Sequence, residues 1–343
     1  MPLLRMIMVL KIFHVLLPAA LLMFNAAAAE SATPQFGAEL QGFDFTLPVQ
    51  RFSFTSQGQA LVMGYIDSQP QGEANGRTVV LLHGKNFCGI TWQDTITALN
   101  HAGYRVIAPD QIGFCTSTKP MRYQYSFQQL AANTRQLLDS LHLSDIILVG
   151  HSTGGMLATR YALMYPQQVQ KLVLVNPIGL EDWKAKGVPW RSVDQWYQRE
   201  LKTSAASIKK YELNTYYVGK WKPEYDRWVT MLAGLNNGPG HQAVAWNSAL
   251  IYDMIFTQPV YYEFKDLAVP TTLIIGTADT TAIGSDIAPP QVRANIGHYN
   301  VLGRQVAALI PHARLIELQG MGHAPQMEDP AGFNRTLLSD IKK

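Results

Sequence analysis

A five-residue motif between a strand-like run and a helix-like run constrains this chain more than any other feature. Residues 150–154 read Gly-His-Ser-Thr-Gly, after the apolar run 146–149 and before the helix-like stretch 156–162. A turn sharp enough to lift a serine above a sheet needs small residues two positions away on each side, as Gly150 and Gly154 provide. The turn also sets Ser152 at a helix N-terminus, where free N–H groups favour negative charge. The motif predicts a nucleophilic serine, with an idle serine in a glycine-rich turn as the alternative.

Two further residues complete a set for nucleophilic catalysis. Asp279 follows the end of one predicted strand, and His323 follows the last predicted strand. His323 would act as general base toward Ser152 and then as general acid, while Asp279 would fix the histidine tautomer. Asp286, in the same loop as Asp279, is the alternative acid. We favour Asp279 because it lies closer to the strand end.

The loop after the predicted strand 78–82 is expected to contribute to an oxyanion hole. It begins His83-Gly84-Lys85. A tetrahedral oxyanion needs two preorganised donors, and removing one costs on the order of 100-fold in rate. We assign these donors to the backbone N–H groups of Thr153 and Lys85, with His83 and Gly84 as supporting residues. The alternative is an ordinary His-Gly turn.

Apolar runs without alternation predict strands that are buried on both faces, as in a parallel sheet covered by helices. The first two predicted strands are expected to form a hairpin. Helices are expected over 126–143, with Ser126 as N-cap, and from Asp329 to Lys342. The predicted strands are 51–55, 60–65, 78–82, 104–108, 146–149, 172–175, 271–276 and 314–318.

These motifs and their order resemble the α/β-hydrolase superfamily, in the branch of capped serine hydrolases. The matching segments, within a similarity that runs from about 52 to 341, are His83-Gly84, Asp110-Gln111-Ile112-Gly113, residues 150–154, Asp279 and Gly322-His323. Serine, then acid, then histidine is the chain order of that family. The resemblance implies an α/β fold with a doubly wound, mostly parallel eight-stranded sheet and a helical cap inserted after the sixth strand.

The chain departs from its relatives at informative positions. Many relatives carry glycine where this chain has Cys115, and serine at 152 speaks against the halide- and epoxide-cleaving relatives, whose nucleophile is an aspartate. Relatives similar to proline iminopeptidase need acidic cap residues to hold a substrate amine. Glu181, Asp182 and Glu224 are candidates, although no spacing singles them out.

The expected cap is rich in aromatic residues. Residues 178–266 hold six of the seven Trp and eight of the fifteen Tyr. We expect residues 178–268 to form the helical cap, with some of its aromatic side chains lining an apolar pocket. Residues 30–177 and 269–343 would then be the two parts of the catalytic core.

The N-terminus has the pattern of a signal peptide. Arg5 and Lys11 provide positive charge, residues 12–24 are mostly apolar, and an alanine run ends at Ala29. The apolar stretch is shorter than the roughly 20 residues that span a membrane. We therefore expect residues 1–29 to be removed, leaving no stable membrane insertion and a periplasmic or secreted protein.

The two cysteines, Cys88 and Cys115, lie in loops after strands that are expected to be neighbours. An oxidising compartment would permit a disulfide between them. The alternative is a pair of small buried thiols. We favour the buried thiols.

The sequence predicts a serine hydrolase that cleaves a small or medium apolar carboxylic ester through an acyl-enzyme. The same residues would serve an amidase, a peptidase or a C–C bond hydrolase, and a ligand-binding homologue with little turnover is a further alternative. Charged residues make up only 15% of the chain and form no block, so no nucleic-acid partner is expected. No metal or organic cofactor is expected either. The oligomeric state cannot be predicted from these features.

Overall fold

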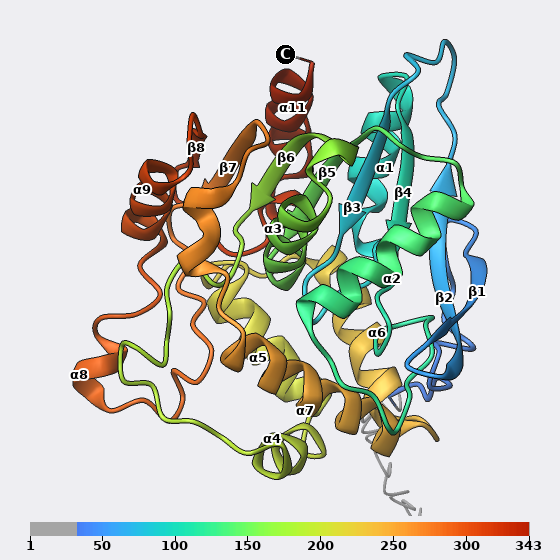
Figure 1. Cartoon of the computed structure of the whole chain (residues 1–343). Coiled ribbons are helices and arrows are strands. Elements are labelled where there is room, and N and C mark those ends of the chain that lie inside the picture. Colours follow the sequence, from blue (N-terminus) through green and yellow to red (C-terminus); the bar gives the residue numbers. More distant parts are fainter. Residues whose placement is uncertain (1–32, 343) are drawn as a thin grey trace, which may run out of the picture. The chain divides into compact units, whose positions relative to one another are not determined.

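The computed structural model describes residues 33–342, and the proposed signal peptide lies outside them. Its centre is one eight-stranded sheet with the strand order β1-β2-β4-β3-β5-β6-β7-β8 (Figure 1). The strands are β1 (Gln50–Ser56), β2 (Gln59–Ser68), β3 (Thr78–Leu82), β4 (Arg105–Pro109), β5 (Ile146–His151), β6 (Val169–Val175), β7 (Thr271–Gly276) and β8 (Arg314–Leu318).

The strand pairing divides the sheet into an antiparallel part and a larger parallel part. β1 and β2 form the predicted hairpin and, with the β2–β4 pair, supply the antiparallel part of the sheet. From β4 to β8 every pair is parallel. All residues of β3, β5 and β7 are buried, as continuous apolar runs require between two helical layers. The prediction of a mostly parallel eight-stranded sheet is confirmed.

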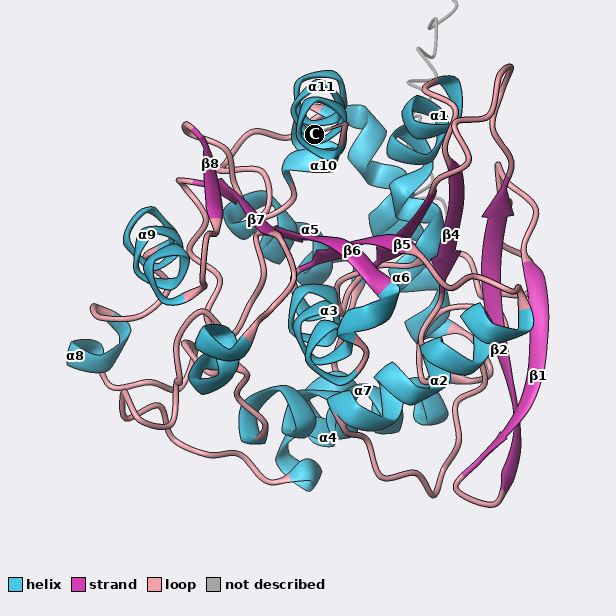
Figure 2. Cartoon of the chain, turned by 45° about the horizontal axis from the view of Figure 1, so that its top comes forward, coloured by secondary structure: helices cyan, strands magenta, loops and turns pink. Residues whose placement is uncertain are grey.

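Helices cover both faces of the sheet. In Figure 2, α1 and α11 lie on one side of the sheet, and α2, α3 and α9 lie on the other. Ser126 accepts a hydrogen bond from the Gln129 N–H as N-cap of α2, and Asp329 caps α11 in the same way. The helices in the core are α1 (Gln93–His101), α2 (Phe127–Ser140), α3 (Thr153–Met164), α8 (Pro290–Arg293), α9 (Tyr299–Leu309), α10 (Pro325–Glu328) and α11 (Pro330–Ile341).

The long connection from β6 to β7 is helical in the structure. Its helices lie together near one end of the sheet (Figure 1). A backbone hydrogen bond from the His323 N–H to the Thr215 carbonyl joins α5 to the loop after β8. The inserted helices therefore border the ends of the strands that carry the candidate site. They are α4 (Val193–Glu200), α5 (Ala205–Thr215), α6 (Asp226–Asn237) and α7 (His241–Thr257), with short 3-10 turns η3 (Pro223–Tyr225) and η4 (Tyr261–Asp266).

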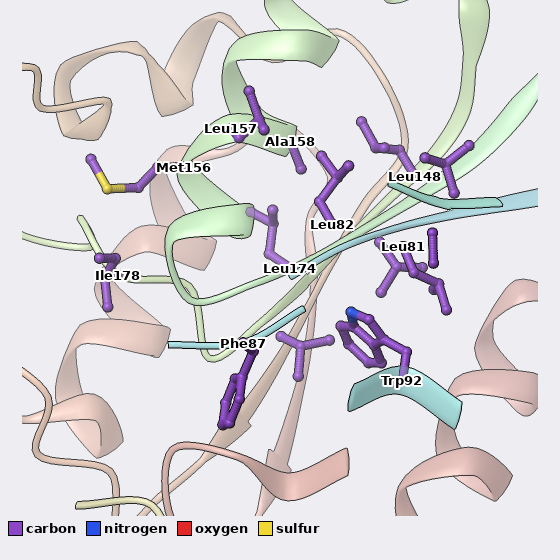
Figure 3. Close-up of a cluster of buried hydrophobic side chains, with 14 of the residues drawn as sticks. Leu81, Leu82, Phe87, Trp92, Leu148, Met156, Leu157, Ala158, Leu174 and Ile178 are labelled. Atoms are coloured by element: carbon purple, nitrogen blue, oxygen red, sulfur yellow. The ribbon is translucent and has the colours of Figure 1, made fainter. Parts of the chain in front are cut away.

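The hydrophobic core reaches the candidate site without a break. Figure 3 shows side chains from β3, β5, β6 and α3 packed together beneath the strand ends. Phe87, from the loop after β3, and Trp92, the last residue of the 3-10 helix η1 (Gly89–Trp92), belong to the same buried cluster. Loops that start from such a close-packed core are held firmly at their bases.

Candidate active site

Ser152 lies in the sharp turn between β5 and α3. Its backbone has φ 56° and ψ −122°, a conformation that is strained for a residue with a side chain and is found mostly at functional sites. A side chain at Gly154 would collide with the carbonyl oxygen of Leu82, and one at Gly150 would lie 2.7 Å from the Ala158 Cβ. The two glycines therefore permit the close packing that the turn requires.

The structure brings the three predicted catalytic side chains into one chain of hydrogen bonds. The Ser152 Oγ lies 2.8 Å from the His323 Nε2, and the His323 Nδ1 lies 2.7 Å from the Asp279 Oδ2. All three residues are buried. The arrangement fits a histidine that donates its Nδ1–H to the carboxylate and accepts the serine proton at Nε2. Asp286 lies elsewhere, with an exposed carboxylate paired to Arg191.

Two residues that the sequence analysis did not single out hold the Asp279 carboxylate. The Asn176 side-chain amide donates to Oδ2 at 2.8 Å, and Thr281 donates to Oδ1 through its backbone N–H and its hydroxyl, at 2.8 and 2.7 Å. Asn176 is fully buried at φ 38° and also accepts a hydrogen bond from the Gly276 N–H. In the sequence it was visible only as the residue that ends the sixth strand.

The loop after β3 lies against the nucleophile. A side-chain carbon at Gly84 would come within 2.9 Å of the Ser152 Cβ, so only glycine fits there without displacement. Thr153 is the first residue of α3, and Lys85 follows Gly84 in a turn. Within residues 33–342, neither the Thr153 N–H nor the Lys85 N–H donates to a protein atom. Two backbone donors beside the serine thus remain available for an oxyanion.

Two buried histidines fix the surrounding loops. His83 accepts a hydrogen bond at Nε2 from the Gln111 N–H and contacts the Gly84 carbonyl through Nδ1, which joins the loops after β3 and β4. The His151 Nε2 donates to the backbone carbonyl of His323 at 2.7 Å. Burial lowers the pKa of both side chains, so both are neutral at pH 7. His151 occupies the first variable position of the motif, and nothing in the sequence indicates its role.

The cysteines form a disulfide, so the expectation of two buried thiols is wrong. The Cα atoms of Cys88 and Cys115 lie 5.8 Å apart, within bonding range. The parallel pairing of β3 with β4 brings their loops together, and Asp110 joins the same loops through the Gly89 and Thr116 N–H groups. Cys115 has φ 39°, a left-handed conformation that suits the glycine of many relatives. The two sulfurs bond to each other and offer no thiolate to a metal.

A cavity of about 350 Å³ lies next to the loop after β3. Apolar and aromatic side chains make up much of its wall, together with Lys85, Asn86 and Glu200. The Asn86 side chain donates to the Tyr216 hydroxyl at 2.9 Å, and the Tyr216 ring centre lies 5.1 Å from that of His323. Ser152 itself does not line the cavity; Asn86, which does, contacts Tyr216, and Tyr216 packs against His323.

Few of the aromatic residues in 178–266 face this cavity. Tyr211 and Tyr252 line it. Tyr217 and Tyr225 instead stack on each other with ring centres 3.6 Å apart, and Trp196 stacks on Tyr252 with ring centres 4.4 Å apart. Most of these rings therefore hold the inserted helices together.

The acidic residues considered for binding an amine do not line the cavity. Glu181 is paired with Lys186, and Asp182 accepts a hydrogen bond from the Tyr262 hydroxyl. Glu224 lies in the short turn η3 and is exposed. The carboxylate that does line the cavity is Glu200, which no sequence motif singles out.

Comparisons with known proteins agree with this fold. The family model described as the alpha/beta hydrolase fold matches residues 77–330. The chain is 28% identical over 290 residues to a non-heme chloroperoxidase of Kitasatospora aureofaciens, covering 78% of this chain and 93% of that protein. It is 28% identical over 264 residues to Lipase 1 of Psychrobacter immobilis, covering 75% of this chain and 74% of that protein.

One solved structure is similar over nearly the whole chain. It is a "probable hydrolytic enzyme" from Pseudomonas aeruginosa PAO1, with 59% sequence identity and a TM-score of 0.89, covering 90% of this chain and 98% of that chain. The match to the family model spans well over half of the residues. The chain therefore belongs to the α/β-hydrolase family and is a hydrolytic enzyme.

Proposed function

We propose that the protein is a serine hydrolase that cleaves a small or medium apolar carboxylic ester through an acyl-enzyme. The observation that carries the proposal is the hydrogen-bonded chain from Ser152 through His323 to Asp279. It lies beside two backbone N–H groups that have no protein acceptor in the described chain. A side-chain relay next to free oxyanion donors is the arrangement that acyl transfer needs.

The first half of the reaction forms the acyl-enzyme. The Ser152 Oγ attacks the ester carbonyl carbon while the His323 Nε2 takes the serine proton. The N–H groups of Thr153 and Lys85 stabilise the negative charge on the carbonyl oxygen. His323 then gives its proton to the leaving alkoxide, and the alcohol departs.

The second half uses water in place of the serine. His323 removes a proton from a water molecule, which attacks the acyl carbonyl carbon, and the same two N–H groups stabilise the oxyanion again. The proton returns to the Ser152 Oγ as the carboxylic acid leaves. Throughout, Asp279 keeps the Nδ1–H of His323 oriented and stabilises the imidazolium. Hydrogen bonds from Asn176 and Thr281 hold the Asp279 carboxylate in place.

The size and lining of the cavity support an apolar acyl group of modest length. Its volume of about 350 Å³ is near the lower end of the range for small-molecule sites. An ester is favoured over a substrate held by its free amine, because the one carboxylate in the cavity lining already accepts hydrogen bonds from Lys85, Arg199 and Ser248. The similarity to a lipase agrees with this choice.

We further propose that the protein is exported, with residues 178–268 acting as a cap over the site. The signal-like segment 1–29 supports export, and so does the Cys88–Cys115 disulfide, since disulfides persist mainly outside the cytoplasm. Among residues 33–342 no helix is long and apolar enough to cross a membrane.

Mass spectrometry of protein from the periplasm or medium tests export. A chain that begins at Glu30 is expected, and a chain with an intact Met1 in the cytoplasm would refute export.

The ester activity is tested with p-nitrophenyl esters from acetate to palmitate. We expect hydrolysis to be fastest for acyl chains of roughly four to eight carbons, because longer chains exceed the cavity. Ser152→Ala is expected to abolish turnover while the protein stays folded. Absence of Ser152-dependent hydrolysis with every ester would overturn the proposal.

A further inference from the structure

The cavity beside the loop after β3 is apolar along much of its wall but strongly polar in one region. Three cationic side chains line it together with a single carboxylate, Glu200: Lys85, which is largely buried, and Arg199 and Lys202, which are exposed. Two positive charges therefore have no counterpart among the lining residues. Asp286 approaches Arg199 from outside the cavity at 3.9 Å, but it is half exposed and bonds more closely to Arg191.

Lys85 holds its charge in a fixed position. Its ammonium nitrogen lies 3.2 Å from the Glu200 Oε2 and 3.8 Å from the centre of the Tyr252 ring, and its side chain is 11% exposed. A lysine ammonium has three N–H donors, and only one is used by a protein acceptor in the described chain. The remaining donors are available to a ligand.

Both carboxylate oxygens of Glu200 already accept hydrogen bonds from protein groups. Oε2 accepts hydrogen bonds from Lys85 and from the Ser248 hydroxyl at 2.6 Å, and Oε1 accepts one from Arg199 at 3.0 Å. Burial alone would raise the pKa of Glu200, but Lys85 and Arg199 outweigh burial and hold this pKa below its usual value. Glu200 therefore orients the two cations and leaves the excess positive charge for a ligand.

Lys85 links this positive charge to the reaction. The backbone N–H of Lys85 is one of the two proposed oxyanion donors, and its side chain extends roughly 6 Å from the backbone into the cavity. A substrate carbonyl at the oxyanion site would thus place a group about five bonds away near the ammonium. The cavity wall also includes apolar side chains, among them Phe87, Phe114 and Ile251.

From this arrangement we infer that the natural substrate is an ester whose acyl part is apolar in the middle and ends in an anionic group, such as a carboxylate, that binds Lys85 and Arg199. The inference rests on the proposed ester hydrolysis and names the substrate class for that site. An anion binds well in a partly desolvated cavity when fixed cations face it.

Two esters of matched length test the inference. Monomethyl adipate carries a carboxylate at the end of its acyl chain, and methyl heptanoate carries a methyl group there. Acid release followed by pH-stat gives kcat/KM for each ester, and the ratio of the two values removes general effects on the catalytic side chains. Wild-type protein is expected to prefer the adipate ester by about tenfold or more.

Charge variants should move this ratio in opposite directions. Lys85→Met removes a cation and is expected to lower the ratio about tenfold. Glu200→Gln keeps a side-chain oxygen that accepts hydrogen bonds from the cations but removes the negative charge that opposes the ligand, so it is expected to raise the ratio. Lys265→Met, at an exposed position in η4 outside the cavity, is the matched control and should leave the ratio unchanged. A structural defect alone would not produce opposite changes.

Binding measurements separate this inference from the proposed function. Calorimetry with monomethyl adipate and Ser152→Ala protein needs no turnover, and the added Lys85→Met change should weaken binding about tenfold. The anionic subsite would be overturned if methyl heptanoate is hydrolysed in a Ser152-dependent way, the adipate ester is not preferred, and neither charge variant changes the ratio. That result would leave the esterase proposal standing. If neither ester is hydrolysed, the esterase proposal is decided by the p-nitrophenyl ester series, and unchanged binding in the double variant would overturn the subsite.

Discussion

Glu212 offers a quantitative test of the structure, because its carboxyl group is buried without a partner. It lies on α5 and is fully buried, and neither carboxylate oxygen has a hydrogen-bond partner in the described chain. Burial raises the pKa of Glu212 to about 8, from an ordinary value of 4.5. Thr215, on the same helix, accepts a hydrogen bond from the His323 N–H through its backbone carbonyl, so the unpaired carboxyl lies close to the candidate site.

The expected pH dependence follows from proton linkage. The folded state keeps the proton on Glu212 up to about pH 8, whereas the unfolded chain releases it above pH 4.5. The unfolded state thus binds fewer protons between these values, and stability falls as the pH rises through that window. With these two pKa values, the loss of unfolding free energy between pH 5 and pH 8 is roughly 3 kcal/mol.

Glu212→Gln removes the titration and keeps the shape of the side chain. A buried amide also lacks partners, but that cost does not change with pH. The melting temperature of the variant minus that of the wild type should therefore increase between pH 5 and pH 8, by roughly 5 °C for a chain of this size. Glu224→Gln, at an exposed position in the same inserted segment, shows the effect of losing a carboxyl at the surface. A Glu212→Gln difference that stays constant across this pH range would refute the reasoning.

Three further predictions concern the acid, the disulfide and a buried hydroxyl. Asp279→Asn should lower kcat for p-nitrophenyl esters by about 10⁴-fold, whereas Asp286→Asn should change it by less than about threefold; the reverse order would make Asp286 the acid. Replacing Cys88 and Cys115 with alanine should lower the free energy of unfolding by about 3.5 kcal/mol in urea titrations, from the loop entropy of a 27-residue separation, and no loss would mean that the thiols are unpaired in solution. Tyr217→Phe should stabilise the protein by roughly 1 kcal/mol, because the buried hydroxyl has no partner in the described chain; a clear loss of stability would reveal a partner for it.

The sequence predicted the sheet well, and it singled out the three side chains that the structure brings into one hydrogen-bonded chain, because local signals specify both. The apolar runs of β3, β5 and β7 are long enough to be buried on both faces, and a Gly-x-Ser-x-Gly turn has few structural solutions. Asp279 and His323 could be found because each lies a few residues after a strand, Asp279 after the buried β7 and His323 after the half-buried edge strand β8. In the structure those strand ends meet at one edge of the sheet, which brings the two residues to Ser152.

Features that depend on distances between remote segments could not be predicted. The disulfide depends on how closely two loops approach, and spacing along the chain does not fix that distance. Glu200 and Lys85 are 115 positions apart, and nothing near either residue indicates that they pair. Asn176 ends a strand as many asparagines do, and its hydrogen bond to Asp279 appears only when β6 and β7 lie side by side.

The most direct test of the central claim is to trap the acyl-enzyme and locate it. Protein mixed with excess p-nitrophenyl butyrate and quenched in acid during turnover is digested and analysed by mass spectrometry. The account predicts a butyryl group on the peptide that contains Ser152, and no adduct in Ser152→Ala protein. Turnover without any adduct on Ser152, or an adduct on another residue that accounts for the rate, would contradict it.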